Sequence, residues 1–80
     1  MLTVHVKLFA TLARDRPGWR HGQAVAVPVP PGGDLGHVLA SLDLPPDQVR
    51  HVFVNGRRRS LDYVPRDGDE LAIFPPIAGG

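Results

Sequence analysis

A strict alternation of apolar and polar side chains opens the chain, and it constrains the fold more than any other feature. Residues 2–8 read Leu-Thr-Val-His-Val-Lys-Leu, so every apolar side chain of the segment falls on the same side. A period of two residues is typical of a strand with one buried face. Because 80 residues make one small domain, the rest of the chain must pack against this apolar side.

The middle of the chain predicts a second strand and one main helix. Residues 24–29 also alternate, but Pro28 cannot donate a ladder hydrogen bond, so this strand belongs at an edge of the sheet. Asp34 is a good N-cap for a helix, and Pro45-Pro46-Asp47 is expected to end that helix. Between them, an apolar stripe with helical spacing is formed by Leu35, Val38, Leu39 and Leu42.

The second half of the chain predicts the remaining strands. Residues 51–54 form a short strand, Asn55-Gly56 is a strong hairpin signal, and residues 57–61 would form a weak return strand. Gly68 is available for positive φ in a turn, and residues 70–74 form the last strand. The sequence therefore predicts an α+β roll with a mixed sheet of about five strands. The first and last strands are central and parallel, and one main helix covers one face.

The composition excludes several classes of site. The chain has no cysteine, which excludes disulfides, thiolate zinc sites and a cysteine nucleophile, and which favours a reducing, cytoplasmic location. A formal net charge of +1 provides no field to attract nucleic acid or an anionic membrane, and no apolar run is long enough to span a bilayer. The histidines have no ligand spacing, so we expect no metal site.

Aromatic side chains fall on the other face of the predicted sheet. Phe9, Phe53 and Phe74 lie opposite the Val, Leu and Ile positions of their strands. If this face is uncovered, it offers an apolar patch suited to docking a partner. The alternative is that Phe9 turns inward at the end of its strand while a loop covers Phe53. We interpret Arg57-Arg58-Arg59 as a solvated hairpin arm that faces an acidic partner edge, rather than as a nucleic-acid contact.

The last six residues form a small tail without charged side chains: Pro75, Pro76, Ile77, Ala78, Gly79 and Gly80. The prolines remove ladder donors and end the sheet, which divides the chain into a domain at residues 1–74 and a flexible tail at residues 75–80. The terminal carboxylate of Gly80 is a poor electrophile until it is activated. The chain has no phosphate-binding loop of the type G-x-x-x-x-G-K-[ST], so we expect no bound cofactor and assign the ATP to a partner enzyme.

Four segments of the chain point to one known family. They are Val6-Lys7-Leu8-Phe9-Ala10, Asn55-Gly56, Asp67-Gly68-Asp69-Glu70-Leu71 and Phe74-Pro75-Pro76-Ile77-Ala78-Gly79-Gly80. With these segments, which span nearly the full length in order, the chain resembles the ubiquitin-like sulfur carriers and most closely the small subunit of molybdopterin synthase. The terminal segment is the most specific of the four. The resemblance implies a β-grasp (ubiquitin-like) fold.

The resemblance also implies a carrier cycle and its partners. An E1-like enzyme would adenylate Gly80, and a sulfurtransferase system would convert the adenylate to a thiocarboxylate. The large subunit of molybdopterin synthase would receive the tail, and its sulfur would enter the dithiolene of the pterin in molybdenum cofactor biosynthesis. Gly80 is then the acyl carrier, Gly79 gives clearance in a tunnel, and the chain is no catalyst alone. The residues implied to contact partner pockets are Phe74, Pro75, Pro76, Ile77 and Ala78.

Two other functions stay open. A carrier with the same chemistry would serve thiamine synthesis, tRNA thiolation, cysteine synthesis or covalent protein modification. A ubiquitin-like interaction module would instead have an inert tail. Mass spectrometry after incubation with ATP, an activating enzyme and a sulfur donor separates carrier from module. Replacement of a terminal oxygen by sulfur supports the carrier, and an unchanged mass supports the module.

Overall fold

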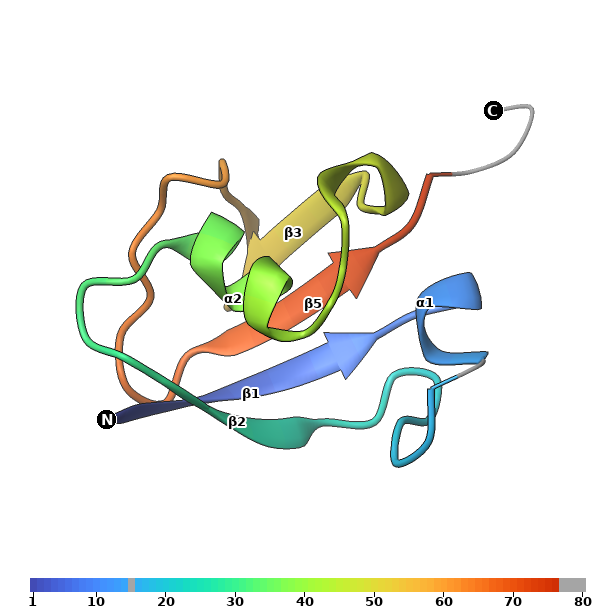
Figure 1. The fold of residues 1–80 in the computed structure, drawn as a ribbon, viewed down its shortest axis with the longest axis horizontal. Coiled ribbons are helices and arrows are strands. Elements are labelled where there is room, and N and C mark those ends of the chain that lie inside the picture. Colours follow the sequence, from blue (N-terminus) through green and yellow to red (C-terminus); the bar gives the residue numbers. More distant parts are fainter. Residues whose placement is uncertain (15, 77–80) are drawn as a thin grey trace.

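A mixed, five-stranded sheet carries the fold, and helix α2 packs across one of its faces (Figure 1). The computed structural model describes residues 1–14 and 16–76. Its elements are β1 (Leu2–Leu8), α1 (Thr11–Arg14), β2 (Val25–Val29), α2 (Leu35–Ser41), a short 3-10 helix (Pro46–Gln48), β3 (His51–Val54), β4 (Arg57–Arg58) and β5 (Glu70–Phe74). The strand order is β2-β1-β5-β3-β4, with β1 and β5 parallel and all other neighbours antiparallel.

The core lies between the sheet and α2, on the side that the alternating residues predict. Val6 and Leu8 of β1 are fully buried, and their register partners on β5, Leu71 and Ile73, are at most 1% exposed. The apolar stripe of α2 completes this core with Leu35, Val38 and Leu39, while Leu42 is half-buried against it. These contacts, with the central parallel pair, confirm the predicted α+β roll and its β-grasp architecture.

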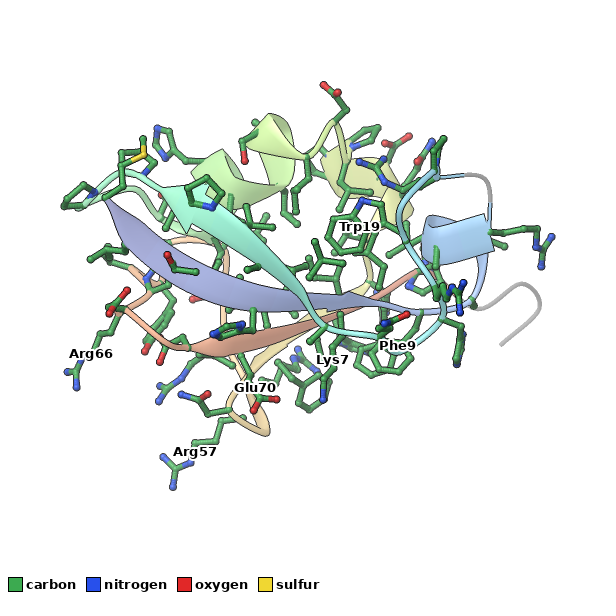
Figure 2. The ribbon with its side chains drawn as sticks, turned by 90° about the horizontal axis from the view of Figure 1, so that it is seen from below. Lys7, Phe9, Trp19, Arg57, Arg66 and Glu70 are labelled. Carbon is green, nitrogen blue, oxygen red and sulfur yellow. The ribbon has the colours of Figure 1, made fainter. Side chains whose placement is uncertain are left out.

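The edge strand and the long connection before it also follow the sequence. Pro28 pairs with Thr3 in β2, the outermost strand beside β1, as its missing N–H predicts. Trp19, from the connection between α1 and β2, is half-buried against the core on the same side of the sheet as α2 (Figure 2). The Arg16 guanidinium donates a hydrogen bond to the Leu42 carbonyl, which ties this connection to the end of α2.

Helix α2 ends earlier than predicted, and its own backbone ends it. Pro45-Pro46-Asp47 was expected to stop the helix, but Asp43 already adopts a left-handed conformation with φ of 56°. The Leu44 N–H donates to the Leu39 carbonyl (2.9 Å) and the Asp43 N–H donates to the Ala40 carbonyl (3.1 Å). This is a Schellman motif, which satisfies two of the free carbonyls at the helix end.

The return strand of the hairpin is shorter than the predicted span of residues 57–61. Strand β4 is limited to Arg57–Arg58, because the chain beyond it turns to the start of α2. There the Leu61 carbonyl accepts from the Gly36 N–H (3.0 Å) and the Tyr63 carbonyl accepts from the Leu35 N–H (2.9 Å). Amides in the first turn of a helix have no partner within the helix, so they draw these carbonyls away from the sheet.

The predicted N-cap of α2 is confirmed. Asp34 Oδ1 accepts a hydrogen bond from the His37 N–H (3.0 Å) and lies 2.7 Å from His37 Nδ1. The hydrogen bond with the His37 side chain is the main reason why the pKa of Asp34 lies below its usual value.

The turn before β5 is organised around the buried carboxylate of Asp69, which is 8% exposed. It accepts hydrogen bonds from the Arg66 N–H (2.8 Å) and from Asn55 Nδ2 (2.9 Å). Asn55 in turn accepts from the Glu70 N–H at Oδ1 (2.9 Å). The β3–β4 hairpin and the start of β5 are therefore joined by side-chain hydrogen bonds, which explains Asp69 and Asn55 without a metal ion.

Truncation of the helix stripe tests the core. Leu39→Ala should lower the free energy of unfolding by about 2–5 kcal/mol, because the side chain is 2% exposed and its loss leaves a cavity. Ala40→Ser, at an exposed position of the same helix, should change it by less than about 0.5 kcal/mol. Urea denaturation of both variants measures the difference. A near-neutral Leu39→Ala would contradict the packing of α2 on the sheet.

Removal of the buried carboxylate tests the turn. Asp69→Ala should cost about 1–3 kcal/mol of unfolding free energy, because two donors lose their buried acceptor. Asp67→Ala is the matched control, since Asp67 accepts only an exposed hydrogen bond from the Thr3 N–H that water can replace. Equal losses of stability in the two variants would show that the buried hydrogen bonds of Asp69 stabilise the fold no more than the exposed one of Asp67 does.

Candidate functional site

The sheet face opposite α2 presents three aromatic side chains that meet at Phe74: Phe9, Phe53 and Phe74, here called the aromatic face. The rings of Phe9 and Phe74 stack with centroids 4.5 Å apart and an interplanar angle of 10°. Phe53 meets Phe74 edge to face at 5.6 Å and 81°. All three side chains are half-buried, and Figure 2 shows Phe9 on the side of the sheet away from α2. Phe9 therefore does not turn into the core.

The strand register brings the three rings together. Leu8 of β1 pairs with Ile73 of β5 in the parallel ladder, so the residues that follow them, Phe9 and Phe74, lie side by side. In the antiparallel ladder, Phe53 of β3 pairs with Ala72, the residue two before Phe74 on the same face of β5. The sequence predicted the shared face from alternation, and the pairing of distant segments supplies the contacts.

Two histidines extend the aromatic face, and the sequence analysis did not include them. His21 lies edge-on to Phe9 at 5.1 Å, and its Nδ1 accepts a hydrogen bond from the Ala10 N–H at 2.9 Å. His51 contacts Phe53 at 6.2 Å from the position two residues before it. The alternation along β3 would have predicted that His51 lies on the same face as Phe53. No sequence signal places His21, because it reaches Phe9 from the loop before β2.

The backbone around Phe9 is locally unusual. Ala10 has a left-handed conformation with φ of 53°, which ends β1 and turns the chain into α1. Such a conformation is costly for a residue with a Cβ, and strain of this kind clusters at functional sites. Gly22, in the loop beside the Phe9 ring, has φ of +71°, a conformation that favours glycine. Together the two backbone turns fix Phe9 against Phe74.

Open hollows flank the rings. The larger one, of about 730 Å³, is lined by Phe9, Ala10, His21, Arg50, His51, Phe53, Phe74 and Pro75. A neighbouring hollow of about 340 Å³ extends along the strands to Lys7 and Glu70. These two residues form an ion pair with Nζ and Oε1 3.3 Å apart. The lining is mostly apolar and aromatic, which suits the docking of an apolar surface rather than proton transfer or nucleophilic chemistry.

The tail begins at the edge of this surface. Strand β5 ends at Phe74, whose carbonyl accepts a hydrogen bond from the Arg50 N–H at 2.8 Å. Pro75 is half-buried and lines the larger hollow, and Pro76 is exposed. The structure thus brings Phe9, Phe53, Phe74 and Pro75 together. The other tail residues of the predicted site lie outside the described residues: Ile77, Ala78, Gly79 and Gly80.

Among residues 1–14 and 16–76, no group of three or more His, Asp or Glu side chains is arranged to hold a metal ion. Within these ranges, no helix combines the length and the hydrophobicity that crossing a membrane requires. Arg57, Arg58 and Arg59 are exposed, as expected for a solvated arm, and the Arg59 guanidinium lies 4.9 Å from the ring centre of Tyr63.

Comparison with known proteins gives relatives along the whole chain. Two crystal structures of small archaeal modifier protein 1 from Haloferax volcanii match closely. One is 30% identical with a TM-score of 0.76, and the alignment covers 96% of this chain and 100% of that one. The other is 32% identical with a TM-score of 0.73, and the alignment covers 98% and 99%. A search of curated protein sequences finds no match.

A more distant structure shares the fold. It is a chain from the complex of subunits 1 and 2 of molybdopterin-converting factor from Helicobacter pylori, which is 20% identical with a TM-score of 0.63. The alignment covers 99% of this chain and 100% of that one. The family model described as Mut7-C ubiquitin matches residues 1–78. The resemblance to ubiquitin-like proteins is thereby confirmed, and the chain belongs to the Mut7-C ubiquitin family.

Proposed function

We propose that the chain is a sulfur carrier that is loaded at the C-terminal carboxylate of Gly80. In this proposal an E1-like enzyme adenylates Gly80, a sulfurtransferase system converts the adenylate to a thiocarboxylate, and the sulfur is donated in molybdopterin synthesis. The chain acts there as the small subunit of molybdopterin synthase, in the cytoplasm. The proposal is supported by the family, by the Gly-Gly sequence of the tail and by the fold shared with the molybdopterin-converting factor complex.

The observation that carries the proposal is the position of Phe74. This residue belongs to the aromatic face and is also the last residue of β5, directly before the tail. A partner that covers the aromatic face therefore contacts the residue from which the tail begins. Docking and delivery of the tail into a partner's active site become one event, which is what a carrier without its own catalytic groups needs.

The chemistry divides between the chain and its partners. A carboxylate resists nucleophiles, so ATP must first convert Gly80 to a mixed anhydride with AMP, releasing pyrophosphate. Sulfur supplied at the oxidation level of hydrosulfide then attacks the acyl carbon and displaces AMP, so the step needs no oxidant or reductant. The resulting thiocarboxylate is an anionic nucleophile, as thiolates are. The chain has no cysteine that would compete for this sulfur. It contributes the acyl group, a narrow tail that fits a tunnel, and the aromatic face that partners bind.

Covalent protein modification is the second candidate. It is favoured by the identity of 30% to 32% with small archaeal modifier protein 1, against 20% with the molybdopterin-converting factor chain. The activation step is the same for both functions. They differ in the acceptor, which is a pterin precursor in one case and a protein amine in the other. Isopeptide-linked adducts of Gly80 recovered from the host would identify the modifier, and sulfur transfer to the pterin would identify the carrier.

Deletion of Gly80 tests the reacting group. The variant should not support ATP–pyrophosphate exchange by the activating enzyme. Its melting temperature should stay close to that of the full chain, because none of the core residues that the structure describes lies beyond Ile73. The mass of the protein isolated from its host first establishes that Gly80 is the mature C-terminus. After incubation with ATP, the enzyme and a sulfur donor, the full chain should show replacement of one oxygen by sulfur. Undiminished exchange by the deletion variant would contradict the proposal.

Truncation of Phe74 tests the docking surface. Phe74→Ala should weaken binding to the activating enzyme on the order of tenfold, because it removes the central ring of the aromatic face. Val64→Ala is the matched control, since Val64 is 46% exposed and lines neither hollow. Isothermal calorimetry measures binding, and thermal unfolding shows whether the variant still folds. If a folded Phe74→Ala protein binds as tightly as the wild type, the activating enzyme does not dock on the aromatic face.

A further inference from the structure

One side of the aromatic face is bordered by arginines that form no ion pair within the part of the chain that the structure describes. Arg50, Arg58 and Arg59, here called the cationic rim, are all exposed. Within residues 1–14 and 16–76, the ion pairs join Lys7 to Glu70 and His37 to Asp34, and neither involves the rim. The tail adds no acidic side chain. The rim therefore leaves a concentrated positive charge on a protein whose net charge is only +1.

The cationic rim and the aromatic face form one continuous surface. A hollow of about 260 Å³ is lined by Val49, Arg50, His51, Val52, Arg58, Arg59, Ser60 and Leu61. It shares Arg50 and His51 with the larger aromatic hollow. The aromatic face and the cationic rim thus meet at Arg50, whose backbone N–H donates a hydrogen bond to the Phe74 carbonyl at the start of the tail.

The pairing of β3 with β4 interleaves apolar and charged groups. Phe53 pairs with Arg58, and directly paired residues of an antiparallel ladder point to the same face. A group that contacts the Phe53 ring is therefore beside the Arg58 side chain. The surface offers an apolar contact and a guanidinium side by side. A purely hydrophobic partner would contact the ring but would leave the guanidinium without an anionic partner.

We propose that this combined surface binds a protein segment that alternates apolar and acidic side chains. The apolar side chains cover Phe53 and Phe74, and the carboxylates pair with Arg50 and Arg58, whose planar guanidinium groups suit bidentate recognition. The inference rests on the proposed function for where such a segment comes from, namely the enzyme that activates the tail. It adds the chemistry by which the partner is selected, with the charged rim steering association and setting register.

An acidic protein segment fits this surface better than a nucleic acid does. Single-stranded nucleic acids stack their bases on free aromatic faces. Here Phe9 and Phe74 are stacked on each other at 4.5 Å, which occupies the ring faces between them. The net charge of +1 also gives little of the long-range attraction on which phosphate binding depends.

A peptide titration tests the inference without any enzyme. The probes are a short peptide that alternates Leu and Glu and its counterpart that alternates Leu and Gln, each added to the isotope-labelled protein. The Leu–Glu peptide should shift the amide resonances of Arg50, His51, Phe53 and Arg58, and the Leu–Gln peptide should bind on the order of tenfold more weakly. High salt should remove this difference. Equal affinity for the two peptides, or stronger binding of a single-stranded oligonucleotide than of the Leu–Glu peptide, would overturn the inference.

Charge reversal with a matched control locates the effect. The double variant Arg50→Glu/Arg58→Glu should bind the Leu–Glu peptide on the order of tenfold more weakly than the wild type does. The control Arg14→Glu/Arg66→Glu makes the same change of net charge at two exposed arginines that line none of these hollows, and it should bind normally. An equal loss in both variants would mean that net charge, and not the rim, decides binding.

The activating enzyme separates this inference from the proposed function. With that enzyme, Arg50→Glu/Arg58→Glu should raise the KM for the carrier on the order of tenfold and leave kcat unchanged, because docking is weakened and chemistry is not. An unchanged KM would overturn the inference while the proposed function stands. A wild-type chain that no activating enzyme adenylates would instead refute the proposed function, and the peptide titration would still decide the inference.

Discussion

The parallel pairing of β1 with β5 is the constraint on which the rest of the structure depends. It joins the first and the last strand of the chain in the interior of the sheet, with Val6 beside Leu71 and Leu8 beside Ile73. The same register has opposite consequences on the two faces. On one face of the sheet it brings together the side chains that α2 covers. On the other face it continues into the stacked pair of Phe9 and Phe74. The β1–β5 register therefore determines the composition of the core, the contacts of the aromatic face and the place where the tail begins.

The turn before β5 sets that register. The Gly68 N–H donates to the Thr3 carbonyl (2.7 Å), and the His5 N–H donates to the Asp69 carbonyl (2.8 Å). Gly68 has φ of 85°, a conformation that suits glycine in a tight turn. The Asp67-Gly68-Asp69 segment, which the family resemblance singled out, thus has a structural task. A slip of β5 by one residue would move Phe74 from the aromatic face into the core.

The sequence predicts what depends on local pattern, and it misses what depends on contacts between distant segments. Alternation places Phe53 on the open face, Pro28 identifies the edge strand, and Asn55-Gly56 gives the hairpin, whose φ values of 51° and 85° are those of a type I′ turn. The end of α2 was missed because Asp43, rather than glycine, adopts the left-handed conformation. The contact of His21 with Phe9 was missed because a loop of unpredictable path brings it there.

A domain of this size covers one face of its sheet and leaves the other for partners. The side chains that hold the fold together lie on the α2 side, so the aromatic face and the cationic rim are free to vary without dismantling the core. That separation explains how relatives with identities of 20% to 32% keep one fold. Under the inference proposed above, partner choice depends on which charges surround the rings next to the tail. In this chain those charges are arginines: the Arg50 N–H donates to the Phe74 carbonyl at the end of β5, and Arg58 on β4 pairs with Phe53 of β3.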